Sequence, residues 1–122
     1  MATTTAPNPI VERAIEDCLQ CLHWCSACID AGLTNDPSAM AGSIRLCGEC
    51  APVCGLTARL LSSNSQFVHQ LCAFCADVCD ACAAECGKHT HMETMRKSAE
   101  ASRRCAKSCR EVAQSSPVRK AA

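Results

Sequence analysis

Apolar and cysteine side chains recur along this chain at alternating steps of three and four residues. In residues 72–86 every repeating position is cysteine, within the run CAFCADVCDACAAEC. Steps of three and four residues place side chains on one face of an α-helix, because the helix has about 3.6 residues per turn. Such a heptad stripe normally carries Leu or Ile and faces the core of a helical bundle. The pattern therefore predicts a helix whose core-facing stripe is a row of thiols.

The same spacing predicts three further helices, and local signals indicate where each begins and ends. The N-cap and proline pairs at residues 8–9 and 36–37 predict the starts of the first two helices. The capping boxes SNSQ at 63–66 and THME at 90–93 predict the starts of the other two. The predicted stops are Gly32, Ser62, Gly87 and the run Ser115-Ser116-Pro117.

Pro52 lies inside the second stripe, where it removes one backbone donor. The stripe keeps its phase across this proline, so a single bent helix is favoured over two shorter ones. Four helices with short connections predict an all-α, up-down-up-down four-helix bundle with a cysteine-lined core. We expect residues 8–116 to form this bundle, with residues 1–7 and 117–122 as flexible tails.

Each predicted helix carries one core-facing stripe, with a second apolar stripe one residue out of phase on the first three. The core-facing positions are Val11, Ala14, Cys18, Cys21, Cys25, Cys28; Met40, Ser43, Cys47, Cys50, Cys54, Thr57, Leu61; Val68, Cys72, Cys75, Cys79, Cys82, Cys86; and His91, Met95, Ser98, Ser102, Cys105, Cys109, Val112. The second stripe is Ile15, Leu19, Leu22, Ile29, Leu46, Val53, Leu60, Phe67, Leu71, Phe74 and Val78. It either seals neighbouring helices or forms an oligomer interface.

Composition narrows the function classes. Fourteen of the 122 residues are cysteine, the formal net charge is zero, and there is no Tyr. A neutral chain with so few aromatic residues predicts neither a nucleic-acid partner nor a membrane surface. The first residues, MATTTAPNPIVER, lack the basic and apolar regions of a secretory signal. We therefore expect a cytoplasmic protein with reduced thiols, unless an export signal has been removed.

Rows of thiols predict binding of soft metal ions. Residues three or four apart on a helix share a face, so neighbouring cysteines of one row offer two sulfurs to one ion. Thiolates select Cu(I), Zn(II) and iron–sulfur clusters, and two sulfurs from one helix suit Cu(I) best. With bridging sulfurs the bundle could hold on the order of a dozen Cu(I) ions. All fourteen cysteines of the core-facing stripes are candidate ligands.

Other uses of the thiols stay open. A zinc or mixed-metal buffer of the metallothionein kind would bind one ion per four thiolates. A thiol redox protein or a set of disulfides would instead contain oxidised cysteines. Catalysis is not expected, because no cysteine stands out beside an activating base and no CxxC follows a βαβ pattern.

The two ends of the predicted bundle differ. The end that holds the first and third loops collects Met40, His89, His91, Met92 and Met95, and three of these, Met40, His91 and Met95, fall on the core-facing stripes. Thioether and imidazole groups are plausible weaker copper ligands. We expect copper to enter there and fill toward the opposite, apolar end. The alternative is that the methionines only fill the core and the histidines are solvated.

The repeated cysteine rows resemble the bacterial copper storage proteins of the cytosolic type. The matching motifs are CxxCxxxCxxC at residues 18–28, CxxCxxxC at 47–54, the ladder at 72–86 and CxxxC at 105–109. The resemblance implies a homotetramer of four-helix bundles that stores many Cu(I) ions, with Met and His residues admitting copper at one end. The fourth helix departs from the pattern, because Ser98 and Ser102 stand where further cysteines are expected.

Overall fold

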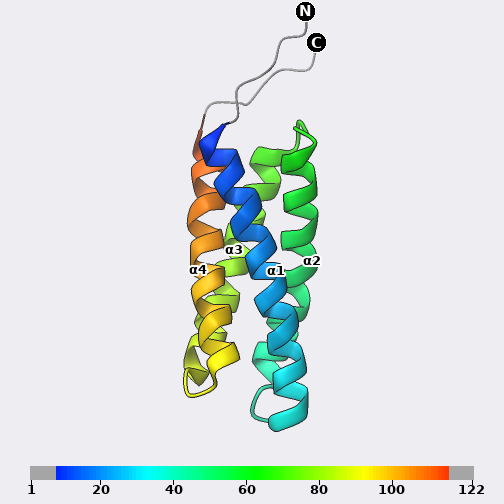
Figure 1. Cartoon of the computed structure of the whole chain (residues 1–122), viewed down its shortest axis with the longest axis vertical. Helices are drawn as coiled ribbons and strands as arrows, with labels where there is room; N and C mark the ends of the chain where they lie inside the picture. Colours follow the sequence, from blue (N-terminus) through cyan, green and yellow to red (C-terminus); the bar gives the residue numbers. More distant parts are fainter. Residues whose placement is uncertain (1–7, 116–122) are drawn as a thin grey trace, which may run out of the picture.

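A computed structural model describes residues 8–115, which form four α-helices that run alternately up and down (Figure 1). The helices are α1 (Pro9–Asn35), α2 (Ala41–Ser62), α3 (Val68–Cys86) and α4 (Glu93–Gln114), and a 3₁₀ turn, η1 (Gly87–His89), follows α3. Each helix packs against two neighbours, in the order α1, α2, α3, α4 and back to α1. The predicted four-helix bundle is confirmed. The predicted tails, 1–7 and 117–122, lie outside the described residues.

The predicted core-facing stripes are buried with two exceptions. All fourteen cysteines have no exposed surface, and Ser43, Thr57, Ser98 and Ser102 are equally buried. Val11 is half-buried at the start of α1, and His91 is exposed. The heptad spacing therefore identified most of the interior of the bundle, but it missed buried small residues beside the stripes, which are seven alanines and Ser108.

One of the four predicted helix starts is confirmed. The prediction that one helix, and not two shorter ones, spans Pro52 is confirmed as well. The Asn8 side chain caps α1, because its Oδ1 accepts hydrogen bonds from the backbone N–H of Ile10 at 3.0 Å and Val11 at 3.5 Å. The second helix is continuous through Pro52, which is exposed on its outer side. An outward-facing proline leaves the core-facing row of α2 in phase.

Gly32 was predicted to stop the first helix, and this was wrong. The first helix continues to Asn35, and Gly32 lies within it, fully buried against α2. A Cβ atom at Gly32 would come within 2.9 Å of Ile44 and 3.2 Å of Met40. This glycine therefore serves close helix packing instead of helix termination.

The other three predicted helix starts were also wrong, because these helices begin two to four residues later than predicted. Residues 37–40 form a turn, whose Ala39 N–H donates to the Asp36 carboxylate, so α2 begins only at Ala41. Asn64 adopts a left-handed backbone with φ of 57°, which prevents a helix from starting at Ser63. The predicted capping box of Thr90 is not formed either, because α4 starts at Glu93 with Met92 at its N-cap and no side-chain cap hydrogen bond.

The residues of the second apolar stripe differ in how far they are exposed to solvent. Most of its members are half-buried and pack against the core, as the sealing interpretation predicts. Leu19, Phe67 and Phe74 remain about half exposed, at 49%, 55% and 54%. Among the helices within residues 8–115, none has the length and apolar character needed to cross a membrane.

Candidate metal centre

Fourteen free thiols line the axis of the bundle. All of them are buried. The 3.6-residue period brings each row to the interior, and the alternating direction of the helices brings the four rows side by side. The result is a column of sulfur atoms enclosed by helix backbones.

Thiols on one helix meet at only one of the two expected spacings. Five pairs that are four residues apart have Sγ–Sγ distances of 3.7–4.0 Å: Cys21–Cys25, Cys50–Cys54, Cys75–Cys79, Cys82–Cys86 and Cys105–Cys109. The sequence predicts that pairs three residues apart meet as well, but none of the five thiol groups contains such a pair. A step of four residues turns the side chain by about 40° and a step of three by about 60°, so the wider turn separates the CxxC sulfurs.

Contacts between helices outnumber those along a helix. Cys47 of α2 lies 3.6 Å from both Cys82 and Cys86 of α3. Further contacts of 3.6–3.9 Å join Cys18 to Cys105 and Cys109, Cys21 to Cys50, Cys25 to Cys82, Cys28 to Cys86, Cys50 to Cys79, and Cys54 to Cys75, Cys79 and Cys105. An ion held in this column would therefore bridge helices more often than it would sit on one of them.

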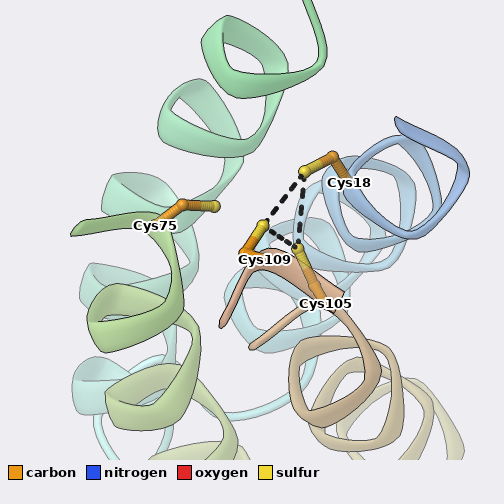
Figure 2. A group of neighbouring side chains, drawn as sticks. All are labelled: Cys18, Cys75, Cys105 and Cys109. Carbon is orange, nitrogen blue, oxygen red and sulfur yellow. Dashed lines mark hydrogen bonds between the residues drawn. The ribbon is translucent and has the colours of Figure 1, made fainter. Parts of the chain in front are cut away.

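Two groups of four thiols occupy the half of the column toward the chain termini. Cys18, Cys75, Cys105 and Cys109 form the outermost of them, with every sulfur within 4.8 Å of the others. Figure 2 shows Cys18, Cys105 and Cys109 as a triangle with edges of 3.6–3.9 Å, and Cys75 pointing toward it from α3. The next group is Cys21, Cys54, Cys79 and Cys105.

Three groups of three thiols continue the column toward the α1–α2 and α3–α4 loops. They are Cys21, Cys25 and Cys50; Cys25, Cys47 and Cys82; and Cys28, Cys47 and Cys86. No cysteine of α4 takes part in these three groups, because Ser98 and Ser102 occupy the corresponding positions. The Ser98 hydroxyl lies 3.7 Å from Cys25 and from Cys47, and the Ser102 hydroxyl lies 3.5 Å from Cys21.

The five groups form one unbroken series. Each group shares one cysteine with the next, and the shared residues are, in order, Cys105, Cys21, Cys25 and Cys47. Cys72 alone among the cysteines belongs to none of the groups. A ligand atom that belongs to two groups can bridge two ions, so this series provides a path of bridging sulfurs through the bundle.

The loop end of the column is lined by thioethers. Met95 is fully buried and its Sδ lies 3.0 Å from the Sγ of Cys28, while Met40 is 4% exposed beside α1. His91 was predicted to lie on the core-facing stripe of the fourth helix, and that placement was wrong. It precedes α4 and is exposed, with its ring centroid 6.2 Å from that of His89.

The opposite end is closed by apolar side chains. Ala14, Leu61, Val68 and Val112 are all buried there, as the core-facing stripes predicted. His69 lies at the same end, on α3, with a ring nitrogen 3.2 Å from the backbone carbonyl of Ser115. That nitrogen is therefore engaged with the end of α4.

Contacts between thiols divide the cysteines by acidity. Hydrogen bonds from Cys47 and Cys86 lower the pKa of Cys28 to about 4, and hydrogen bonds from Cys105 and other neighbours lower the pKa of Cys109 to about 5. The pKa of Cys105 is raised, first by its contact with Cys109. A sulfur that accepts hydrogen bonds is stabilised as the thiolate, whereas its donor keeps the proton. Hydrogen bonds from neighbouring thiols lower the pKa of Cys21, Cys75 and Cys82 as well, so the more acidic thiols are spread along the column.

Sequence comparison assigns this arrangement to a family. A sequence model described as copper storage protein matches residues 8–114. A Bacillus subtilis (strain 168) relative named "uncharacterized cysteine-rich protein YhjQ" is 39% identical over 103 residues, which cover 84% of this chain and 94% of that protein.

Solved structures agree with that assignment. The apo form of copper storage protein 3 from Bacillus subtilis is 38% identical, with a TM-score of 0.77 over 84% of this chain and 97% of that one. A Cu(I)-bound copper storage protein is 37% identical, with a TM-score of 0.81 over 85% and 98%. A cytosolic copper storage protein from Streptomyces lividans, with five coppers, is 38% identical with a TM-score of 0.80 over 87% and 93%. The match over nearly all described residues shows that this chain belongs to the copper storage protein family.

Proposed function

We propose that this protein stores multiple Cu(I) ions on the thiolates of its core and catalyses no reaction. The observation that carries the proposal is the unbroken series of five thiol groups, each joined to the next by one shared cysteine. A catalytic site needs one activated group beside a substrate, whereas this column repeats the same ligand along the whole bundle. Repetition with shared ligands is what a store for many ions requires.

The number of thiols in each group favours Cu(I) over zinc as the bound ion. Structural zinc takes four ligands in a closed tetrahedron, but three of the five groups offer only three thiols. Soft thiolates select Cu(I), which accepts two or three sulfurs and shares them between ions. The relatives support this choice, since one solved structure is described as Cu(I)-bound and another as loaded with five coppers.

We further propose a cytosolic location. The Streptomyces lividans relative is described as cytosolic. All fourteen thiols here are free, and a reducing compartment preserves them in that state.

Anaerobic titration of the reduced protein with Cu(I) against a competing chelator tests the storage proposal. We expect binding to continue to on the order of a dozen ions per chain, because bridging sulfurs bring the ratio near one ion per cysteine. At lower pH the same titration should give weaker binding, since copper must displace the thiol protons. Saturation at one or two ions would contradict storage. Zinc retained against Cu(I) at one ion per four cysteines would support a zinc buffer instead.

Single substitutions test the importance of the shared sulfurs. Cys105 belongs to both four-thiol groups, whereas Cys72 belongs to no group. Cys105→Ser should therefore lower the copper capacity by about two ions, and Cys72→Ser by one at most, given that each shared thiolate bridges two ions. The capacity of each purified variant is measured by the same titration, with circular dichroism as the check on folding. An equal loss in both variants would show that the groups do not act as units.

We propose that copper enters at the loop end, where Met40, Met95 and His91 are its first ligands. The 3.0 Å contact between Met95 Sδ and Cys28 Sγ supports transfer from a thioether to a thiol. His91 is exposed beside that end and is reachable from solvent.

Met95→Leu keeps the volume of this side chain and removes its sulfur, so we expect slower copper uptake with unchanged final capacity. Stopped-flow absorbance of the copper–thiolate bands measures the rate. Met92→Leu, a half-buried methionine off the core-facing stripe, is the matched control. An unchanged rate in Met95→Leu would remove the thioether from the uptake path.

We also propose that the protein assembles as a homotetramer. The exposed Leu19, Leu56, Phe67 and Phe74 support this assembly, since large apolar side chains are about half exposed on three helices. Light scattering coupled to size-exclusion chromatography should give four times the 12.9 kDa chain mass. Phe74→Glu should lower that mass, because a buried charge opposes assembly. A monomeric mass for the unmodified protein would contradict the proposal.

A further inference from the structure

Ser43 has a buried hydroxyl with no hydrogen-bond partner. Of all buried side-chain nitrogen and oxygen atoms in the described part of the chain, its Oγ alone lacks one. The residue has no exposed surface. An unpaired buried hydroxyl destabilises a folded protein, so its presence calls for an explanation.

The neighbours of Ser43 show that it faces the axis of the bundle. A side chain placed at Gly42 would meet the Glu85 carboxylate of α3, and Ile44 packs against Gly32 of α1. Ser43 lies between these two positions in the sequence and has no exposed surface. It therefore occupies the interior row of α2, one turn before Cys47.

Cys47 is the natural acceptor for this hydroxyl. Cysteines four residues apart on one helix have Sγ–Sγ distances of 3.7–4.0 Å. Ser43 and Cys47 are also four residues apart on one helix. Cys47 is also the sulfur shared by the two thiol groups nearest the loop end. In the metal-free bundle it contacts other thiols and the Ser98 hydroxyl, and it makes no hydrogen bond with Ser43.

We propose that Ser43 is a positioning residue that donates its hydroxyl proton in a hydrogen bond to the Cys47 thiolate when copper is bound. Copper binding forms a Cu–S bond and breaks the S–H bond, and the released proton passes to solvent. Ser43 keeps its own proton and directs it at the sulfur, which is now anionic. This inference rests on the proposed storage of Cu(I).

The change in acceptor strength explains why the hydroxyl stays unpaired without copper. A thiol sulfur is a weak acceptor, whereas a hydrogen bond to an ionised acceptor is about twice as strong as one between neutral groups. Hydrogen bonds to metal-bound sulfur orient the ligand and tune the site. The cost of the unpaired hydroxyl in the metal-free protein is then recovered in the copper-loaded one.

The position of Ser43 fits the composition of the column. The groups near the loop end have three thiols each, and hydroxyls stand in place of further sulfurs there. The Ser98 hydroxyl of α4 lies 3.7 Å from the Cys47 Sγ, and Ser43 lies one turn before Cys47 on α2. One hydroxyl thus contacts the sulfur that both groups share, and a second lies one helical turn away from it.

The variant Ser43→Ala tests the proposal with two readouts that should move in opposite directions. The metal-free variant should unfold at a higher denaturant concentration than the unmodified protein, because an unpaired buried polar group is removed. The Cu(I) ions bound by Cys47 should bind about tenfold less tightly, as expected for one lost hydrogen bond to a charged acceptor. The total copper capacity should not change. Anaerobic competition with a Cu(I) chelator and urea unfolding under reducing conditions supply these measurements.

Thr57→Val is the matched control. Thr57 is an equally buried residue of α2, but its hydroxyl donates to the Val53 carbonyl at 2.7 Å. Its loss should leave copper affinity unchanged and should not stabilise the metal-free protein. A copper-loaded crystal structure should also bring the Ser43 Oγ to hydrogen-bond distance from the Cys47 Sγ.

Several results would overturn the proposal. A less stable metal-free Ser43→Ala variant with normal copper affinity would give Ser43 an ordinary packing role. Equal weakening of copper binding in Ser43→Ala and Thr57→Val would point to a general effect of the core. The storage proposal fails separately, when the unmodified protein binds only one or two ions.

Discussion

The thiol rows must pack the core, as Leu and Ile do in an ordinary bundle, and they must also offer ligands to metal ions. The rest of the structure depends on these two requirements. A reduced cysteine behaves as a small apolar residue, so fourteen buried thiols still allow a continuous core. Each one buries less apolar surface than Leu, and hydrophobic stabilisation scales with that surface. The helices therefore need to approach closely, which a small residue such as Gly32 allows where α1 meets Ile44 of α2.

The same sulfurs couple metal binding to folding. A ligand that binds the folded chain more tightly than the unfolded one stabilises the fold by mass action. The groups of three and four thiols draw on α1, α2, α3 and α4 in different combinations, so each bound ion would tie helices together. Copper would in this way supply the cohesion that the small thiol side chains do not supply by themselves.

Most of the interior and half of the helix ends could be predicted from the sequence, whereas the other ends and the pairing of sulfurs could not. The three-and-four spacing identified the buried rows between Ala14 and Val112, because an amphipathic helix buries one face. The start of α1 and the ends of α2, α3 and α4 followed from local signals, but the end of α1 depended on tertiary contacts, such as the packing of Gly32 against Ile44. His91 was misplaced for this reason, since the start of α4 decided whether it joined the buried row. The distances between rows depend on how the helices pack, and no local spacing encodes them.

The two halves of the column differ in how much negative charge they can hold. Each thiolate without its own Cu(I) ion leaves a buried negative charge, and such a charge is costly unless hydrogen bonds or cations offset it. Near the apolar end, where α4 contributes Cys105 and Cys109, each group contains four thiols, so more sulfurs would surround a bound ion. Near the loop end, Ser98 and Ser102 take the places of two sulfurs. A hydroxyl there removes one negative charge and adds a donor for the remaining thiolates. The serines therefore do more than lower the number of thiols in that half, because their hydroxyls also favour the thiolate form of neighbouring sulfurs at the end where we propose that copper enters.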